Sequence, residues 1–451
     1  MKFDYDVAYL GSGHSCWHGA LTLAAAGEKV VLMDHDLPGG ACTNYGCDAK
    51  ILLDGPFEYL EGLQRYRDIC VEHPGTIDWK TLMAYKKRVL TPFPKILAGM
   101  LEQAGLDFIR ERGKLLDAHT IRAGDKTITA ETIVLGVGQR SARLNIPGRE
   151  YLHDSREFLD IEEMPEHLVC IGAGIISMEF ASMALTLRRK VTFIEFMPRA
   201  LAAYPEKYVS KLVEKMTAQG ADFHFGEAVC SVEKTETGYK VVTKSGLCVE
   251  GDYVLDATGR VANYEDLGLE ELGIPASRRG IQVDDHLRTC VPNIYVSGDA
   301  IDKDIPRLTP TAEFESNYIA SQILGLSDAP IRYPAVPNLV FTLPRIAQVG
   351  VTVDEAEKCP ERYRVVDIPY GVQNEWVDNR ELDIDLTFII DKEGFLAGAA
   401  LYGSEAGTWI DFLTLVINKK IGGEELRNMI FAFPTQTYMI ASTLIPLLRK
   451  Q

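Results

Sequence analysis

Residues 39–47 read Gly39-Gly40-Ala41-Cys42-Thr43-Asn44-Tyr45-Gly46-Cys47, which places two cysteines five residues apart behind a pair of glycines. An α-helix completes a turn in about 3.6 residues, so this spacing would let two sulfur atoms meet across one helical turn. Two cysteines with such a motif, in a chain that lacks a disulfide framework, are more often catalytic or metal-binding than structural. The alternative is a pair of buried thiols that never meet.

The segment before this stretch follows a strand–turn–helix–strand pattern. Residues 5–10 predict a buried strand, Gly11-Ser12-Gly13 predicts a tight turn, and a helix then leads to a strand over 29–33 that ends at Asp34. Glycines at such a turn let the backbone approach a pyrophosphate, and the acid can accept a hydrogen bond from a ribose hydroxyl. The third glycine position of the usual motif holds Cys16, another small residue.

A second unit with the same pattern begins near residue 167. A strand is predicted over 168–171, the turn Gly172-Ala173-Gly174 follows, and a helix then leads to a strand over 190–194 that ends at Glu195. A carboxylate at this point would repel a 2′-phosphate, so the sequence favours NADH over NADPH. Arg199 is the one cation close enough in sequence to favour the opposite choice.

The remaining sequence adds helices and short strands. Residues 50–105 have the mixed polar and apolar spacing of helices, and short strands are expected over 107–110, 120–122, 132–135 and 294–297. The last strand is followed by Gly298-Asp299, whose acid could contact a nucleotide or cap a helix that starts near Thr311.

The pattern of predicted strands and helices changes from Pro337 onward. Strands are predicted over 340–342, 386–390 and 396–402, and they surround helices over about 408–419 and 423–430. Prolines at 330, 334 and 337 mark the boundary. The pattern predicts a separate α+β domain at the end of the chain.

Composition limits the possible partners. The 451 residues carry 47 basic and 64 acidic side chains, a formal net charge of −17, which argues against nucleic acid and anionic lipid as partners. Nine cysteines are scattered along the chain and only the first pair has a motif. The sequence shows no signal peptide and no apolar run that could cross a bilayer, so a reducing cytoplasm is expected.

Taken in order, these motifs resemble the flavoprotein disulfide reductases, such as glutathione reductase, dihydrolipoamide dehydrogenase and mercuric reductase, over nearly the whole chain. The resemblance is carried by the motifs above and by Glu179, Ala257-Thr258-Gly259-Arg260, Leu308-Thr309-Pro310, Phe341-Thr342, Ile346-Ala347 and Pro434-Thr435. It implies two Rossmann-like, three-layer ββα nucleotide-binding domains and a C-terminal α+β dimerisation domain. The expected segments are an FAD domain over 1–148, an NAD domain over 149–285, a return segment of the FAD domain over 286–335, and a dimerisation domain over 336–451.

The family resemblance assigns cofactors, a homodimer and site residues. FAD would be held by Gly11, Gly13, Asp34, Gly40, Ala41, Lys50, Asp299 and Thr309, with the backbone near Leu115 at the adenine. The nicotinamide cofactor would be held by Gly172, Gly174, Glu195 and Gly259.

The resemblance also implies a relay of electrons from NADH to flavin and on to a Cys42–Cys47 disulfide. Cys47 would face the flavin and Cys42 the substrate, which Cys42 would attack as a thiolate. Lys50 resembles the family lysine that lies at the flavin and pairs with the acid matched by Glu179. The spacing from Cys47 to Lys50 is one residue shorter than the usual one.

The C-terminal motif departs from the family pattern. Where the family carries a histidine and its orienting acid, which shuttle protons for the partner subunit's thiols, this chain has Phe433 and Tyr438. Phenylalanine cannot accept a proton, and general acid–base help is worth about 10²–10⁴ in rate, so ordinary disulfides should be reduced slowly. The acceptor is therefore left open among an activated disulfide, a metal ion, a quinone and oxygen.

Two further readings stay open beside this oxidoreductase. One is reductive cleavage of a C–S bond, because ketopropyl-coenzyme M reductase/carboxylase also has phenylalanine at the position matched by Phe433. The other is a flavin-bearing redox sensor or interaction module that has lost turnover. Mercury is disfavoured as a substrate because the chain lacks the C-terminal cysteine pair of mercuric reductase.

Overall fold

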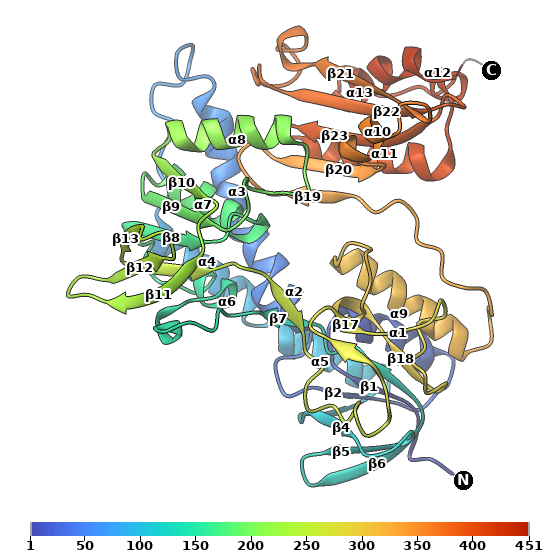
Figure 1. The fold of residues 1–451 in the computed structure, drawn as a ribbon. Helices are drawn as coiled ribbons and strands as arrows, with labels where there is room; N and C mark the ends of the chain where they lie inside the picture. The colour runs from blue at the N-terminus through green and yellow to red at the C-terminus, as the bar shows by residue number, and fades with distance from the viewer. Residues whose placement is uncertain (1, 450–451) are drawn as a thin grey trace.

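The computed structural model describes residues 2–449. Its N-terminal part is built on a sheet in the order β3-β2-β1-β6-β5-β4, with β18 added beside β6 (Figure 1). β1 pairs in parallel with both β2 and β6, and the apolar side chains of β1 and β2 are almost fully buried. The strands are β1 Tyr5–Leu10, β2 Val30–Met33, β3 Asp107–Ile109, β4 Gly113–Leu115, β5 Thr120–Ala123, β6 Lys126–Leu135 and β18 Ile294–Val296.

Two helices far apart in sequence pack together on this sheet, α1 (His14–Ala25) and α9 (Thr309–Ile323) (Figure 1). Their backbones come very close, since a Cβ on Gly19 would lie 2.4 Å from the carbonyl oxygen of Ser316. The Gly19 N–H also donates to the Ser316 hydroxyl at 2.9 Å. Only glycine allows this approach, which fixes how the side chains of the two helices face each other.

The expected helical stretch over 50–105 divides into three helices. They are α3 Cys47–Gln64, α4 Trp79–Leu90 and α5 Phe93–Gln103. The Asp78 carboxylate caps α4 by accepting a hydrogen bond from the Thr81 N–H. The buried sides of α3 and α4 join a core that extends to Phe180 on α7 of the second unit, so these helices connect the two nucleotide-type units.

The second unit has a parallel sheet in the order β10-β9-β8-β14 and a separate antiparallel sheet β11-β12-β13. Helix α7 is almost wholly buried, and its apolar composition all round explains why. The elements are α6 Ser155–Phe158, β8 His167–Ile171, α7 Ile175–Thr186, β9 Lys190–Glu195, α8 Glu206–Ala218, β10 Ala221–Phe225, β11 Val229–Lys234, β12 Tyr239–Thr243, β13 Cys248–Gly251 and β14 Tyr253–Asp256.

The C-terminal part is a five-stranded antiparallel sheet in the order β19-β20-β23-β22-β21, packed by helices through the fully buried Trp409. The first strand was predicted over 340–342 but lies at 338–340, because the chain leaves the sheet before Phe341. The elements are β19 Asn338–Val340, β20 Ile346–Gly350, α10 Val353–Lys358, β21 Tyr363–Pro369, β22 Asp385–Asp391, β23 Leu396–Tyr402, α11 Ala406–Lys419, α12 Gly423–Arg427 and α13 Gln436–Leu444.

The short elements are β7 Gln139–Ser141, β15 Arg260–Ala262, β16 Ala276–Ser277, β17 Gly280–Ile281 and the 3₁₀ turns Arg149–Tyr151, Gly298–Ala300, Gly371–Gln373 and Ile445–Leu447. Within residues 2–449, no helix is both long enough and apolar enough to cross a membrane. The predicted α/β fold class with two Rossmann-like units and a C-terminal α+β domain is confirmed. The domain boundaries themselves remain predictions.

One carboxyl group in the C-terminal domain is buried at a cost. Asp378 is 2% exposed, and among residues 2–449 neither of its oxygens has a hydrogen-bond partner. Burial, followed by the negative charges of Glu381 and Glu405, raises the pKa of Asp378 to about 7. The folded protein therefore holds a proton here that the unfolded chain releases near pH 4.

Asp378→Asn is expected to stabilise the fold in a pH-dependent way. Between about pH 4 and 7 the parent loses free energy of unfolding as pH rises, because only the folded state keeps the proton. The variant lacks this loss, so the stability gap should widen over that window and stay constant above it. Urea unfolding at pH 5, 6, 7 and 8 measures the gap. A gap that does not change with pH would contradict the assignment.

Candidate active site

The first glycine turn leaves room for backbone only. Gly11 has φ +119°, and a Cβ there would lie 2.3 Å from the carbonyl oxygen of Gly136. Gly40 has φ +67°, and its Cβ would lie 2.8 Å from the Cα of Gly13, which is the N-cap of α1. Three backbone segments therefore converge on the N-terminus of α1, where N–H groups and the helix dipole favour an anionic ligand.

Asp34 and Cys16 complete this turn. One Asp34 oxygen accepts from the Ser12 hydroxyl at 2.7 Å and the other from the Asp36 N–H at 3.0 Å, so the carboxylate is held at the end of β2. Cys16 is fully buried, and a Cβ on Gly136 would lie 2.1 Å from its sulfur. Cysteine is tolerated at the third glycine position because Gly136 leaves space for its sulfur.

The two cysteines of the central motif are not on one continuous helix. Cys42 lies on α2 (Gly40–Tyr45), the chain breaks at Gly46 with φ −135° and ψ −113°, and Cys47 begins α3. A Cβ on Gly46 would lie 2.8 Å from the Ala41 carbonyl oxygen, so a side chain would not fit. The expectation of one uninterrupted helical turn is wrong, and the sulfurs approach through a glycine kink.

The two thiols have opposite acidities. Hydrogen bonding from Cys42, assisted by the Thr309 hydroxyl and the Lys50 cation, lowers the pKa of Cys47 to about 6. The same hydrogen bond and burial raise the pKa of the Cys42 thiol far above its usual value. These two directions favour placing the negative charge of the reduced pair on Cys47, beside the Thr309 hydroxyl. Cys42 needs a base before it can act as a nucleophile.

A buried ion pair lies one turn below Cys47. Lys50 Nζ is 3.2 Å from Glu179 Oε1, and the two side chains are 17% and 5% exposed. The ammonium also lies 3.5 Å from the centroid of the Phe341 ring, and the Phe341 N–H donates to the same carboxylate at 2.8 Å. Burial raises the pKa of Glu179, and the Lys50 cation opposes this. The spacing from Cys47 to Lys50, although one residue shorter than usual, keeps the two residues on the same face of α3. Lys50 therefore lies near Cys47 and still reaches Glu179.

Lys50→Gln is expected to raise the pKa of Cys47 by about one unit, because the thiolate loses a nearby cation. The rate of iodoacetamide alkylation of Cys47 as a function of pH measures it. Lys95→Gln removes the same charge from an exposed position of α5 and should leave the profile unchanged. Superimposable profiles for Lys50→Gln and the parent would show that Lys50 does not act on Cys47.

Residues from the return segment close the site. Thr309 is the first residue of α9, and its hydroxyl lies 3.6 Å from the Cys47 sulfur. Asp299 is half-buried in a 3₁₀ turn, and within residues 2–449 its carboxylate accepts no side-chain hydrogen bond. The alternative that Asp299 caps the following helix is wrong, because Leu308 is the N-cap of α9.

Leu115, expected near an adenine, has its N–H engaged by the carbonyl oxygen of Leu267 at 2.8 Å. Its side chain is 1% exposed in the core. Its N–H is therefore not free to bind an adenine, and a contact from this edge of the sheet has to use other backbone groups.

The second glycine turn repeats the geometry of the first. Gly172 has φ +96°, with a Cβ position 2.8 Å from the Ala257 carbonyl oxygen, and Gly174 is the N-cap of α7. Gly259 has φ +137°. Glu195 holds the turn, because its carboxylate accepts from the Ala173 N–H at 2.5 Å and from the Met197 N–H at 2.7 Å.

Arg199 points away from this acid. Its guanidinium donates to the backbone carbonyl oxygens of Leu201, Ala202 and Tyr204 at 2.7–3.3 Å. The cation that could have favoured a 2′-phosphate is therefore committed to the following loop.

Phe433 and Tyr438 lie in the C-terminal domain and are not brought to the cysteines of the same chain. Phe433 is 65% exposed, and its ring contacts Tyr438 edge-on at 5.1 Å and Trp376 at 6.3 Å between centroids. Met429 and Ile430, which precede Phe433 closely in the chain, are also exposed. An exposed apolar surface of this kind is typical of a protein interface.

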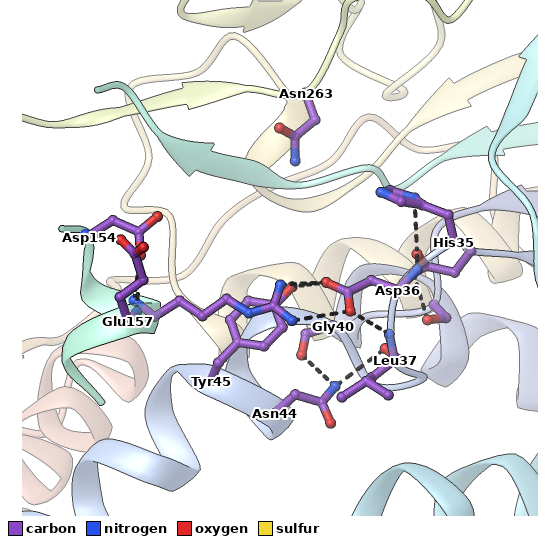
Figure 2. A network of polar contacts seen from close by, with 12 residues as sticks. His35, Asp36, Leu37, Gly40, Asn44, Tyr45, Asp154, Glu157 and Asn263 are labelled. Carbon is purple, nitrogen blue, oxygen red and sulfur yellow. Dashed lines mark hydrogen bonds and ion pairs between the residues drawn. The ribbon is translucent and has the colours of Figure 1, made fainter. Parts of the chain in front are cut away.

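A polar network anchors the cysteine-bearing helix, and apart from Asn44, which stands in the cysteine motif, the sequence did not point to it (Figure 2). Asp36 accepts from Arg156 at 2.7 Å and from the Tyr45 hydroxyl at 3.0 Å, and the guanidinium lies 3.9 Å from the Tyr45 ring centroid. The Asn44 amide donates to the backbone carbonyls of residues 37, 38 and 40. Because Arg156 belongs to α6, this network ties α2 to the second unit.

A second group of residues beside the cysteines was also missed. His14 and His18 lie one turn apart on α1 and contact each other. His14 also contacts Thr43 on α2, and His18 lies near Glu313 on α9. The i,i+4 spacing of the two histidines is a readable signal. Their contact with Glu313 is not, because it depends on how α1 packs on α9.

Comparison with known proteins gives two family matches. The family described as pyridine nucleotide-disulphide oxidoreductase matches residues 5–316, and the dimerisation domain of the same family matches residues 336–443. Dihydrolipoyl dehydrogenase of Bacillus subtilis is 28% identical over 448 residues, covering 96% of this chain and 94% of its own. The chloroplastic/mitochondrial glutathione reductase of Pisum sativum is 32% identical over 387 residues, covering 81% of this chain and 68% of its own.

Among solved structures, the HOCl-induced flavoprotein disulfide reductase RclA from Escherichia coli aligns with a TM-score of 0.85 at 24% identity, covering 99% of this chain and 100% of that one. Its Cu(II) complex aligns with a TM-score of 0.88, also at 24% identity, covering 100% of both chains. At this identity the likeness shows the shared fold.

Proposed function

Because the chain belongs to the pyridine nucleotide-disulphide oxidoreductase family, we propose that it passes electrons from NADH, through FAD, to a Cys42–Cys47 disulfide and on to an external acceptor. The family is one of flavin-dependent enzymes that act on sulfur groups and use a pyridine nucleotide. The observation that carries the proposal is the position of Cys47 at the start of α3, with the Thr309 hydroxyl 3.6 Å from its sulfur and Lys50 one turn along the same helix, a setting that lowers the pKa of Cys47.

The residues present fit FAD. A Cβ would fill the cradle at Gly11 and Gly40, and the adjoining Gly13 opens the N-terminus of α1 to a pyrophosphate. Asp34 would hold the ribose, and Asp299, whose carboxylate has no side-chain donor in the described chain, would accept from the cofactor. Ala41, Lys50 and Thr309 lie next to the cysteines, where the isoalloxazine is expected.

FAD, when bound, would supply two-electron transfer between the nicotinamide and the disulfide. The chain's own residues then set the chemistry of the thiols. Lys50 and the start of α3 hold negative charge on Cys47. Glu179 and Phe341 hold Lys50 in place from two sides. Cys42 is left as the protonated thiol that meets the acceptor.

NADH is the proposed donor at the second site. Glu195 lies at the end of β9, where its carboxylate would meet a ribose hydroxyl and repel a 2′-phosphate. Arg199 is engaged with backbone carbonyl oxygens and cannot offset that repulsion. Gly172, Gly174 and Gly259 provide the close backbone approach for the pyrophosphate.

The dimerisation domain supports a homodimer, which would bring the partner's exposed C-terminal surface to the site. Because Phe433 cannot exchange protons, the proposed acceptor is one that needs little help for its leaving group: an activated disulfide, a metal ion, a quinone or oxygen. The Cu(II) complex of RclA, which shares the fold, makes Cu(II) a reasoned member of the test set.

Anaerobic titration of the FAD-loaded dimer with NADH tests the proposal. Loss of the flavin absorbance together with two new thiols per chain is expected. The reduced enzyme is then mixed with 5,5′-dithiobis(2-nitrobenzoate), Cu(II), a water-soluble quinone and oxygen in turn, and the acceptor that reoxidises it fastest is the best candidate. No spectral change on addition of NADH would overturn the proposal.

A further inference from the structure

The lysine beside Cys47 begins a row of three charged side chains along one face of α3. Lys50, Asp54 and Glu58 follow one another at intervals of four residues, so each lies about one helical turn from the next. The Lys50 side chain is 17% exposed and the Asp54 side chain 2%, whereas Glu58 at the end of the row is 38% exposed. A carboxylate buried as deeply as Asp54 needs a cation beside it.

Arg345 supplies that cation from the C-terminal domain. It lies between β19 and β20, and its side chain is 4% exposed. Its guanidinium donates to Asp54 at 2.6 Å and to Glu58 at 2.8 Å. Among residues 2–449, Asp54 makes no other ion pair. The counter-ion of Asp54 is therefore a residue 291 positions away in the chain.

Phe341 connects this arginine to Lys50. The centroid of its ring lies 3.5 Å from Lys50 Nζ and 4.8 Å from Arg345 Cζ, so both cations contact the same aromatic ring. The Phe341 N–H donates at 2.8 Å to Glu179 Oε1, the oxygen that lies 3.2 Å from Lys50 Nζ. Lys50 is thus held between α7 of the second unit and the C-terminal domain.

Two buried carboxylates are candidates for pairing with Lys50. Asp54 is its i,i+4 neighbour on α3, a spacing at which lysine and aspartate can pair. In the structure, Lys50 lies with Glu179 instead, while Asp54 is engaged by Arg345. Burial raises the pKa of both acids; Arg345 and then Lys50 oppose this at Asp54, and Lys50 opposes it at Glu179. The choice of partner by Lys50 therefore depends on which cation Asp54 has.

Resting on the proposed function, we propose that Arg345 is a positioning residue for Lys50: by engaging Asp54, it keeps the ammonium group at Glu179 and near Cys47. Without Arg345, the buried Asp54 carboxylate has no counter-ion, which is costly, and Lys50 is the cation one turn away on the same helix. Helical side chains lean toward the N-terminus, which for Lys50 is the direction of Cys47. Pairing with Asp54 would draw the ammonium group the opposite way along α3.

The groups around the thiolate make Lys50 the route by which Arg345 acts. Those that act on the Cys47 sulfur are Cys42, Thr309, Lys50 and Asp48. The groups that act on Asp54 are Arg345, Glu58 and Lys50. Asp54 is seven residues beyond Cys47, about 10 Å along the helix axis, so its direct effect on the thiolate is smaller than that of Lys50.

The pH dependence of Cys47 alkylation in the FAD-loaded dimer tests this role. The disulfide is first opened with a phosphine reductant, so the measurement does not require NADH. Iodoacetamide labelling of Cys47 is then followed by peptide mass spectrometry between pH 4 and 9. Arg345→Gln is expected to raise the pKa of Cys47 by about half a unit, less than Lys50→Gln, because the ammonium group is moved rather than removed.

A rescue variant separates positioning from damage to the fold. In Arg345→Gln/Asp54→Asn the neutral amide no longer attracts Lys50, so the pKa of Cys47 should return to within about 0.2 unit of the parent value. Packing lost at Arg345 would not be restored by a change at Asp54. Where Arg345→Gln alone fails to fold, Asp54→Asn and the double variant are compared. Both lack the buried carboxylate and should give the same profile.

Two control variants match the changes in charge. Glu58→Gln removes the outer acid of the row, and Arg362→Gln removes an exposed arginine of the same domain. Both should leave the profile of Cys47 unchanged. An unshifted profile in Arg345→Gln would overturn the inference, as would a double variant whose profile differs from that of Asp54→Asn.

The titration with NADH separates this inference from the proposed function. If NADH generates no thiols but the Arg345→Gln profile shifts and is rescued, the proposed function fails and the positioning role stands. If thiols appear on NADH addition but the profiles of Arg345→Gln and the parent coincide, the proposed function stands and this inference fails.

Discussion

Replacing Cys42 by serine is expected to abolish electron transfer to a thiol-dependent acceptor while NADH still reduces the bound flavin. Serine cannot form a disulfide, and a hydroxyl at this position has no low-energy anionic form, so acceptor reduction should fall by at least about 10³-fold. The Cys47 side of the site keeps Thr309 and Lys50, and the second glycine turn is untouched. The nicotinamide end of the relay should therefore continue to work.

Stopped-flow absorbance separates the two halves of this reaction. Flavin bleaching after NADH addition reports the first, and release of thionitrobenzoate from 5,5′-dithiobis(2-nitrobenzoate) reports the second. Cys248→Ser removes an exposed cysteine of β13 and should behave as the parent in both. Equal acceptor reduction by Cys42→Ser and the parent would remove the cysteine pair from the mechanism.

Restoring a proton-exchanging pair at the C-terminus is expected to give the second large effect. Phe433→His combined with Tyr438→Glu should raise kcat/KM toward a small disulfide, such as oxidised glutathione, by about 10²-fold or more. The two rings already touch, at 5.1 Å between centroids, so the substituted acid can orient the imidazole. An imidazole there can protonate the leaving thiolate, which phenylalanine cannot do.

Steady-state kinetics with NADH and oxidised glutathione measure this gain, and its bell-shaped pH dependence should report a group that titrates near neutrality. Phe433→Gln with Tyr438→Glu introduces a polar side chain without a titratable ring and serves as the control. An unchanged rate in the histidine variant would show that the pocket, not the missing base, limits small disulfides.

Much of the fold could be predicted from local patterns. The buried strand over 5–10, the strand over 190–194 extended by Glu195, and the last strand over 396–402 match the structure closely. Such strands are readable because a parallel or central strand is apolar along its whole length. Both glycine turns were predicted for a different local reason. Only glycine permits the close backbone approaches seen at Gly11 and Gly172.

Other local features were predicted incorrectly or not at all. The break at Gly46 was missed because a glycine inside a helical spacing does not by itself show a kink, and the kink depends on contact with Ala41. Helices α8 and α13 and strands β20 and β21 were also missed. Their amphipathic patterns become distinct only once the faces that they cover are known.

By itself, the sequence determined the two nucleotide-type turns, the cysteine pair and the order of the domains, because each depends on residues close together in the chain. The family resemblance predicted that Lys50 pairs with Glu179, and the two side chains do meet. Only the tertiary structure decided that Arg156 ties Tyr45 and Asp36 together and that Glu313 reaches His18. Those contacts join helices and strands separated by large parts of the chain. The geometry of the Glu313–His18 contact follows from the close packing of Gly19 on Ser316, which brings α1 and α9 together, rather than from any spacing that can be read along the sequence.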